Sequence, residues 1–180
     1  VEHYILSSGV KEIIEGTPIA KYFKRIYACE FHYNKVGNAD WPKQVINYTT
    51  KTQFIFRISK GVLDQLDDKR LNSVIDPNDR RIPYRNMIYI GDGLTDVPCM
   101  QIIRDNGGEA IALYSKSSVD VAKRLFKEKR VGYMCKADYS SGGELESVMK
   151  LLIHQMALTS ELVDIHKKQE EVFLGEHHEQ

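Results

Sequence analysis

The chain has 180 residues, of which 28% are charged, and its 25 basic and 25 acidic side chains give a formal net charge of zero. This length suits one domain with a sizeable core. The balanced charge argues against a phosphate-seeking surface for nucleic acid, and no apolar run is long enough to span a bilayer. We expect a cytoplasmic protein that binds neither nucleic acid nor a membrane, in which Cys29, Cys99 and Cys135 are reduced thiols.

The first third of the chain alternates between strand and helix patterns. Residues 3–6 and 26–29 are strand-like, and each lies next to a short helical stretch, at 10–15 and 19–24. Residues 31–41 alternate between apolar and polar side chains around Val36-Gly37-Asn38-Ala39, which predicts a hairpin.

A longer helix is expected from Lys51 to Leu66, because apolar residues recur there every three or four positions. These apolar positions are Phe54, Ile55, Ile58, Val62 and Leu66. The polar residues 73–85 contain two prolines and predict a loop. Its arginines, Arg80, Arg81 and Arg85, either meet an anionic substrate or lie solvated, and the second interpretation is favoured.

The second half of the chain repeats the alternation with clearer boundaries. Strands are predicted at 87–90, 110–114 and 131–134, and helices at 96–105, 118–129 and 144–173, the last with a break near 158–160. The pattern predicts an α/β fold, a three-layer sandwich with a Rossmann-like, mainly parallel sheet and a small hairpin. We assign residues 1–158 to the core and 159–180 to a carboxyl-terminal helix and tail, with a frayed end at Glu176–Glu179.

The stretch Met87-Ile-Tyr-Ile-Gly-Asp-Gly-Leu-Thr-Asp-Val-Pro98 is the most informative in the chain. Its apolar run suits a buried parallel strand, and open α/β folds bind ligands where such strands end. Asp92 and Asp96 follow the strand on one turn and predict an oxygen site suited to Mg²⁺. The alternative is an ordinary turn in which Asp96 caps the next helix.

Two polar groups upstream add to this turn. Ser7-Ser8-Gly9 follows the first strand-like run, and Lys51 lies in the first turn of the predicted helix, where its charge opposes the helix dipole. Taken alone, Ser7 is an ordinary turn serine and Lys51 a solvated lysine. The ordered set of Ser7, Lys51 and Gly-Asp-Gly-x-x-Asp resembles the haloacid dehalogenase superfamily, nearest to its phosphoserine-phosphatase-like branch, over residues 2 to 135.

The resemblance implies a Mg²⁺-dependent phosphomonoester phosphatase that acts on a small phosphorylated substrate. Ser7 would correspond to the second family motif, Lys51 to the third, and Asp92 with Asp96 to the fourth. It implies that Ser7, the Ser8 amide and Lys51 bind phosphate, that Ser7, Lys51 and Asp96 take part in catalysis, and that Asp92 and Asp96 hold Mg²⁺. Gly93 is expected to be needed for the backbone geometry of the turn.

The chain departs from the family at its first motif. An Asp-x-Asp whose first aspartate attacks phosphorus should precede Ser7, but the six residues upstream contain no aspartate. We interpret the chain as the carboxyl-terminal part of a longer protein whose amino-terminal fragment supplies a central strand and the nucleophile, so that the chain alone would be inactive. The alternative is a catalytically dead binding or scaffolding domain. Phosphoserine, another small phosphomonoester and a phosphocholine-type ester remain open as substrates.

Overall fold

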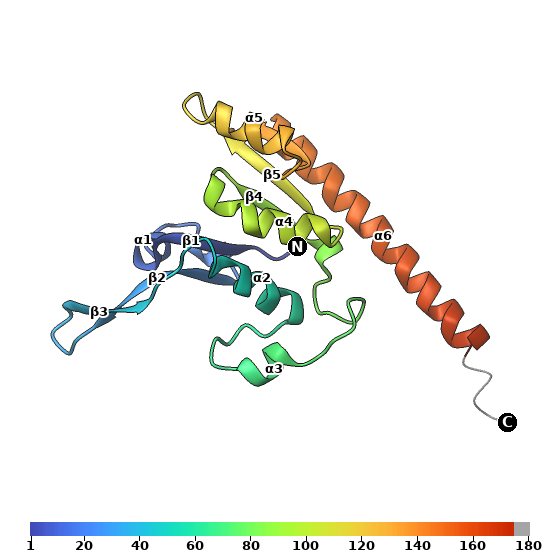
Figure 1. Cartoon of the computed structure of the whole chain (residues 1–180), viewed down its shortest axis with the longest axis horizontal. Coiled ribbons are helices and arrows are strands. Elements are labelled where there is room, and N and C mark those ends of the chain that lie inside the picture. The colour runs from blue at the N-terminus through green and yellow to red at the C-terminus, as the bar shows by residue number, and fades with distance from the viewer. Residues whose placement is uncertain (175–180) are drawn as a thin grey trace.

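The computed structural model describes residues 1–174 and shows an α/β fold (Figure 1). Its first half contains β1 (Tyr4–Val10), α1 (Lys11–Glu15), η1 (Ala20–Tyr22), β2 (Arg25–Tyr33), β3 (Ala39–Gln44), α2 (Lys51–Lys60) and α3 (Asp68–Asn72). Its second half contains η2 (Tyr84–Asn86), β4 (Ile88–Gly91), η3 (Leu94–Asp96), α4 (Val97–Asp105), β5 (Glu109–Tyr114), α5 (Val119–Lys127), β6 (Tyr133–Lys136) and α6 (Glu144–Leu174). The predicted alternation of strands and helices is confirmed.

The strands pair as two three-stranded sheets. In the first, β1 lies parallel to β2, and β2 and β3 form the predicted antiparallel hairpin. In the second, β4, β5 and β6 are all parallel in that order. Each of β1 and β4 therefore has one edge with no strand partner among residues 1–174. The arrows of β1 and β5 point to the same side in Figure 1, so the parallel strands of both sheets have their carboxyl ends on that side, whereas β3 runs the other way.

The first strand is longer than its apolar run predicts. β1 continues through Ser7, Ser8 and Gly9 to Val10, although its register with β2 shifts between Leu6 and Val10. The expectation that Ser7 follows the end of the strand is therefore wrong. The serine lies within a strand, at the irregular part of its pairing.

Helix α2 ends earlier than its apolar periodicity predicts. Gly61 has a φ of 73°, a left-handed conformation that glycine adopts without a Cβ penalty, and it terminates the helix. The N–H of Val62 donates to the carbonyl of Arg57 at 2.9 Å, which closes the last turn. Val62 is buried in the segment after the helix, whereas Leu66 is exposed, so the prediction of a helix to Leu66 is wrong.

Helix α6 is continuous over 31 residues, and the predicted break at residues 158–160 is wrong. The hydroxyls of Thr159 and Ser160 donate to the carbonyls of Gln155 and Met156, both at 2.9 Å. Because this arrangement satisfies both hydroxyls four residues back within the helix, the two residues do not interrupt it. The boundary assigned after residue 158 falls inside this helix, and the predicted frayed end at Glu176–Glu179 lies outside the described residues.

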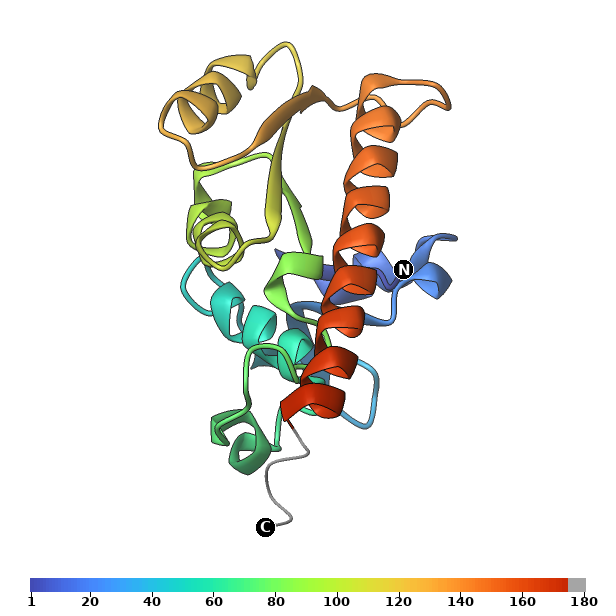
Figure 2. The same cartoon turned by 90° about the vertical axis from the view of Figure 1, so that its right-hand side faces the viewer.

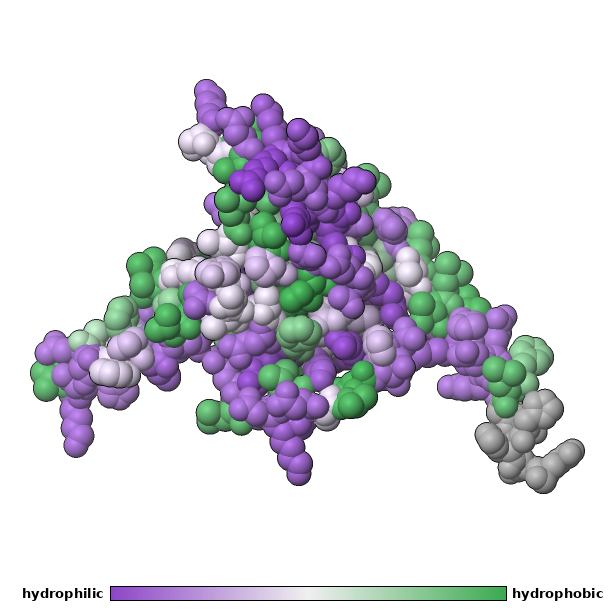
Figure 3. Space-filling model, viewed as in Figure 1, coloured by the Kyte–Doolittle hydropathy of each residue, from purple (hydrophilic) through white to green (hydrophobic). Residues whose placement is uncertain are grey.

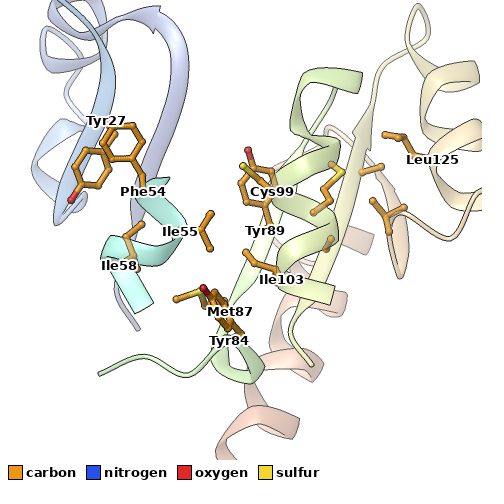
Figure 4. Packing of buried hydrophobic residues seen from close by; sticks show 14 of the residues in the cluster. Tyr27, Phe54, Ile55, Ile58, Tyr84, Met87, Tyr89, Cys99, Ile103 and Leu125 are labelled. Atoms are coloured by element: carbon orange, nitrogen blue, oxygen red, sulfur yellow. The ribbon is translucent and has the colours of Figure 1, made fainter. Parts of the chain in front are cut away.

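One hydrophobic cluster joins the two sheets through α2 and α4. Tyr27 of β2 stacks on Phe54 of α2 with ring centroids 4.3 Å apart. Figure 4 shows Ile55 of α2 facing Tyr89 and Cys99 of the second half of the chain, and all of these residues belong to one buried cluster. A smaller cluster lies between the second sheet and α6, where Leu145 and Leu152 are buried.

The surface is mostly hydrophilic in the view of Figure 3, with hydrophobic residues on the projecting β2–β3 hairpin and along α6. No helix within residues 1–174 is both long and apolar enough to cross a membrane. All three cysteines are free thiols, as predicted. Cys99 and Cys135 are buried, and Cys29 is partly exposed.

Candidate functional site

A buried ion pair joins two of the predicted site residues. Nζ of Lys51 donates to Oδ1 of Asp96 at 2.7 Å, and both residues are about 5% exposed (6% and 5%). They are 45 positions apart in the chain, one at the start of α2 and the other in η3, just after β4. Removing these two charges from water costs free energy, and their mutual attraction offsets that cost only when the geometry is good and further hydrogen bonds are made. This pair is the centre of the candidate site.

The lysine is placed by the turn that starts α2. The side-chain oxygen of Asn47 accepts from the backbone N–H groups of Thr49 and Thr50, both at 3.0 Å. The N–H of Lys51 donates to the carbonyl of Asn47, also at 3.0 Å. These bonds hold the first turn of α2, from which the lysine side chain extends to the strand end of the other sheet. An ammonium has three donors, and the contact with Asp96 uses one of them.

The carboxylate of Asp96 is held by groups of β4 and of the turn after it. The hydroxyl of Tyr89 donates to Oδ1 at 2.8 Å, and the N–H of Gly93 lies 3.4 Å from Oδ2. Gly91 lies so close to this side chain that a Cβ there would come within 2.7 Å of Oδ2. The turn therefore needs a glycine at position 91 to admit the carboxylate.

Burial near the Asp96 carboxylate keeps the Tyr89 hydroxyl and the Cys99 thiol protonated. Burial raises the pKa of the Tyr89 hydroxyl well above its ordinary value of 10.0, and the negative charge of Asp96 adds to the shift. The hydroxyl therefore remains a donor to the carboxylate. Burial also raises the pKa of the Cys99 thiol to about 11, so this thiol is neutral at pH 7.

The expectation for Gly93 is wrong. Its φ is −139°, which any residue can adopt, and a Cβ at this position would meet its nearest neighbour, Oγ1 of Thr95, at an ordinary 3.7 Å. The glycine that the geometry requires is Gly91, which the sequence pattern also displays. Tyr89 was missed as well, because a tyrosine in an apolar strand is indistinguishable by pattern from a core residue.

Asp92 lies one residue after β4, and its side chain is exposed. It makes no hydrogen bond or ion pair with any other residue in the described range, whereas Asp96 is bound to Lys51 and Tyr89. Within residues 1–174, no group of three or more His, Cys, Asp or Glu side chains could hold a metal ion. Mg²⁺ is usually bound through one or two carboxylates with substrate phosphate and water. Of the two carboxylates of this turn, Asp92 is thus the one whose oxygens are open to a ligand.

Ser7 and Ser8 are not joined to the ion pair by any hydrogen bond between described residues. Oγ of Ser7 accepts from the N–H of Gly9 at 2.9 Å, which leaves the hydroxyl proton available for a further acceptor. Ser8 is exposed, and its carbonyl accepts from the thiol of Cys29 at 3.4 Å. The structure thus brings together Lys51 and Asp96 by direct contact, and leaves Ser7, Ser8 and Asp92 outside that contact.

The three arginines of the 73–85 segment are engaged within the chain. The guanidinium of Arg80 lies over the ring of Tyr84, 4.8 Å from its centroid. Arg81 binds the carboxylate of Glu2, and Arg85 donates to the side chain of Asn78 at 2.9 Å. Arg81 is exposed, as the favoured interpretation of these arginines as solvated charges expects, whereas Arg80 and Arg85 are half-buried and depart from it.

Two shallow hollows of about 340 and 380 Å³ lie elsewhere on the surface, beside α1 and β2. Both are lined by Lys11, Arg25 and Ile26, and neither by Lys51 or Asp96. We place the candidate site by its chemistry, because a buried ion pair at strand ends is more specific than an open hollow on the surface.

No protein-family model matches the chain. The chain is 30% identical over 162 residues to an uncharacterized protein of Borreliella burgdorferi, a match that covers 81% of this chain and 55% of that protein. The chain thus spans about half the length of the curated relative it matches.

Proposed function

We propose that this chain is the carboxyl-terminal part of a Mg²⁺-dependent phosphohydrolase of the haloacid dehalogenase type, which cleaves small phosphomonoesters. The observation that carries the proposal is the buried contact between Lys51 and Asp96. A lysine at a helix start, held by a carboxylate that follows a parallel strand, is a fixed positive charge at the edge where α/β folds bind ligands.

The proposal that a strand is missing from the sheet is supported by the unpaired edges of β1 and β4. Buried parallel sheets usually have both edges of their inner strands paired, yet among the described residues each of these strands has one partner. Ile90, in β4, is 40% exposed, although the strand belongs to an apolar run. One further parallel strand between β1 and β4 would join the two sheets into a single sheet with helices on both faces, the predicted three-layer sandwich. The match to the Borreliella burgdorferi protein covers only 55% of that protein, which agrees with an additional segment in the complete protein.

In the proposed reaction each residue has a distinct role. The ammonium of Lys51 would place a point charge on a phosphate oxygen, and Asp96 is a positioning residue that keeps the ammonium charged and oriented. The Ser7 hydroxyl and the Ser8 amide would donate to other phosphate oxygens. An aspartate outside this chain would attack phosphorus, giving an aspartyl-phosphate that water hydrolyses.

Mg²⁺ would be held by Asp92 together with substrate phosphate, water and a carboxylate from outside the chain. When bound, it would neutralise charge on the phosphoryl group. Asp96 was expected to be a second ligand, but its Oδ1 is already bound to Lys51 and Tyr89. We therefore assign metal binding to Asp92 and lysine positioning to Asp96.

The test compares the 180-residue chain with the product of the complete gene, using p-nitrophenyl phosphate and Mg²⁺. We expect little or no hydrolysis by the chain alone and clear hydrolysis by the complete product, lost in Asp92→Asn. Asp105→Asn is the matched control, because Asp105 is exposed and is the last residue of α4, at the end of the helix away from Asp92. Full activity of the 180-residue chain alone would overturn the proposal, since a residue within it would then attack phosphorus.

A binding or scaffolding domain of the same fold is the second candidate. It is favoured by the contacts of Asp96, whose Oδ1 is bound to Lys51 and Tyr89 as in a purely structural ion pair. An Asp-x-Asp after an apolar strand upstream of Val1 in the gene would count against it. If the complete gene product lacks both that motif and phosphatase activity, the binding domain becomes the better assignment.

A further inference from the structure

Helix α6 has two different faces. The inner face contacts the rest of the molecule through Leu145, Leu152 and, further along, Ser160 and Lys167. Ser160 accepts from the side chain of Asn86 at 3.1 Å, and Lys167 forms an ion pair with Asp79 at 2.9 Å. The inner face is thus attached to the molecule over most of the helix, and Figure 2 shows the helix in front with no other described element covering its outer side.

The outer face repeats with a period of seven residues. The positions one heptad apart starting at 151 hold Leu151, Leu158, Ile165 and Val172. The positions starting at 148 hold Val148, Gln155, Leu162 and Gln169. The two series alternate at spacings of three and four residues, which are the a and d positions of a coiled coil, with 148 as an a position. We call these eight positions the α6 seam.

The α6 seam is uncharged, and seven of its eight positions are exposed, whereas Val148 is half-buried and packs against the smaller cluster under α6. Leu151, Leu158, Leu162, Ile165 and Val172 are 51 to 71% exposed. The nine Asp, Glu and Lys residues of α6 all lie at other positions of the helix. A helix face in contact with water would be expected to carry some of these charges. The pattern indicates a surface that is covered by another helix.

We propose that the α6 seam binds the same seam of a second copy of this chain, forming a parallel two-stranded coiled coil. The positions of Gln155 and Gln169 favour a second copy as the partner and a parallel orientation of the two helices. In a parallel pair in register, Gln155 meets Gln155 and Gln169 meets Gln169, and each amide offers both a donor and an acceptor to its equal. In an antiparallel pair, with Leu162 opposite Ile165, Gln155 would meet Val172 and Gln169 would meet Leu158, so four amides would be buried against apolar side chains. A polar residue at an a position is a known determinant of register and of the two-stranded state.

The flanking positions are compatible with this arrangement. In a parallel pair the g position of one helix lies near the following e position of the other, which places Glu161 near His166. Lys168 would lie near Phe173, a neutral aromatic partner. No pair of like charges meets across the parallel seam at these positions.

The test measures the mass of the 180-residue chain in solution by sedimentation equilibrium. We expect a concentration-dependent dimer that becomes a monomer in the double variant Leu158→Gln/Leu162→Gln. The matched control is Ala157→Gln/Asp164→Gln, which places the same side chains on exposed helix positions outside the seam and should leave the dimer unchanged. Circular dichroism of both variants checks that the helix content is retained.

Direction is tested by oxidation of single cysteine variants at the seam. Leu158→Cys should form a disulfide-linked dimer, because equal positions meet in a parallel pair, and the unmodified chain should not. Cross-linking only when Leu158→Cys is mixed with Gln169→Cys would indicate an antiparallel pair and would overturn the assigned arrangement. A chain that stays monomeric at every concentration, or a dimer that persists in Leu158→Gln/Leu162→Gln, would overturn the interface itself.

Discussion

Two carboxylates of this molecule, Asp96 and Glu2, form ion pairs with distant segments of the chain but lie in opposite surroundings. Lys51 and Asp96 are buried, with side chains 7 and 8% exposed. Glu2 binds both Arg81 and Lys24 at the surface, where the three side chains are 31 to 40% exposed. Both carboxylates contact cationic side chains directly, but water screens only the charges around Glu2.

The difference determines what each pair contributes. An exposed ion pair contributes about 0–1 kcal/mol, because water and salt already stabilise its charges. A buried ion pair adds little to the free energy of unfolding compared with an apolar pair of the same shape. Removing one partner, however, leaves the other charge buried without compensation. The buried pair is therefore suited to holding a charge in place for function, while the exposed pair fastens the amino end to the 73–85 segment.

The largest effect is expected for Asp96→Ala. It leaves the Lys51 ammonium buried without its partner, which should lower the free energy of unfolding by about 3–5 kcal/mol in urea denaturation. The double variant Lys51→Met/Asp96→Leu should recover most of this loss, because it removes both charges together. A loss in Asp96→Ala as small as that of a surface substitution would show that the pair is hydrated.

Tyr89→Phe sharpens the comparison by keeping the ion pair and removing one hydrogen bond. Because the acceptor is charged, we expect a loss of about 1.5–3 kcal/mol, measured by guanidinium denaturation. Tyr114→Phe is the control, since the Tyr114 hydroxyl makes no hydrogen bond with another residue of the described range. Equal losses in the two variants would contradict the assigned bond.

Gly91→Ala tests whether a Cβ at position 91 clashes with the side chain of Asp96. The added Cβ would lie 2.7 Å from Oδ2 of Asp96, so the turn must shift, at a cost of about 1–3 kcal/mol. Gly93→Ala, two residues on, should change the melting temperature little. If Gly93→Ala proved the more damaging of the two, the close approach at Gly91 would be refuted.

The smallest effect is expected at Glu2. Its contacts with Arg81 and then Lys24 hold the pKa of the carboxyl well below its ordinary value of 4.5. Because the folded-state pKa is depressed, its contribution to stability is present above pH 4.5 and is lost as the pH falls below it. Glu2→Gln should lower stability at pH 7 by at most about 1 kcal/mol, and less in high salt. The difference between the two proteins should shrink as the pH is lowered below 4.5, which thermal unfolding at several pH values can follow.

Local signals in the sequence predicted the elements well where those signals were unambiguous. β4 and the turn after it were placed within a residue, because an apolar run ending at Gly91 is a local pattern. The end of α2 was misplaced, since the apolar positions Val62 and Leu66 masked the stop at Gly61. The break in α6 was wrong because Thr159 and Ser160 satisfy their hydroxyls within the helix.

The contacts of the candidate site could not be predicted from the sequence. Lys51 and Asp96 were both identified, but residues 45 positions apart meet only through the tertiary fold, which no local pattern describes. Asp96 was assigned to metal because its bonds to Lys51 and Tyr89 could not be seen in the sequence. The division into two sheets depends on the absence of pairing between β1 and β4 among the described residues, which no local pattern describes.

The pairing within each sheet also has a consequence for how the chain folds. Neighbouring strands in both sheets are consecutive in sequence, so every ladder can form from nearby segments at a small cost in loop closure. The packing of α2 on α4, with the Lys51–Asp96 contact, closes a longer loop between the two sheets. We expect each sheet to form early as a local unit, and the buried charges to be desolvated only in the last step, when the units dock.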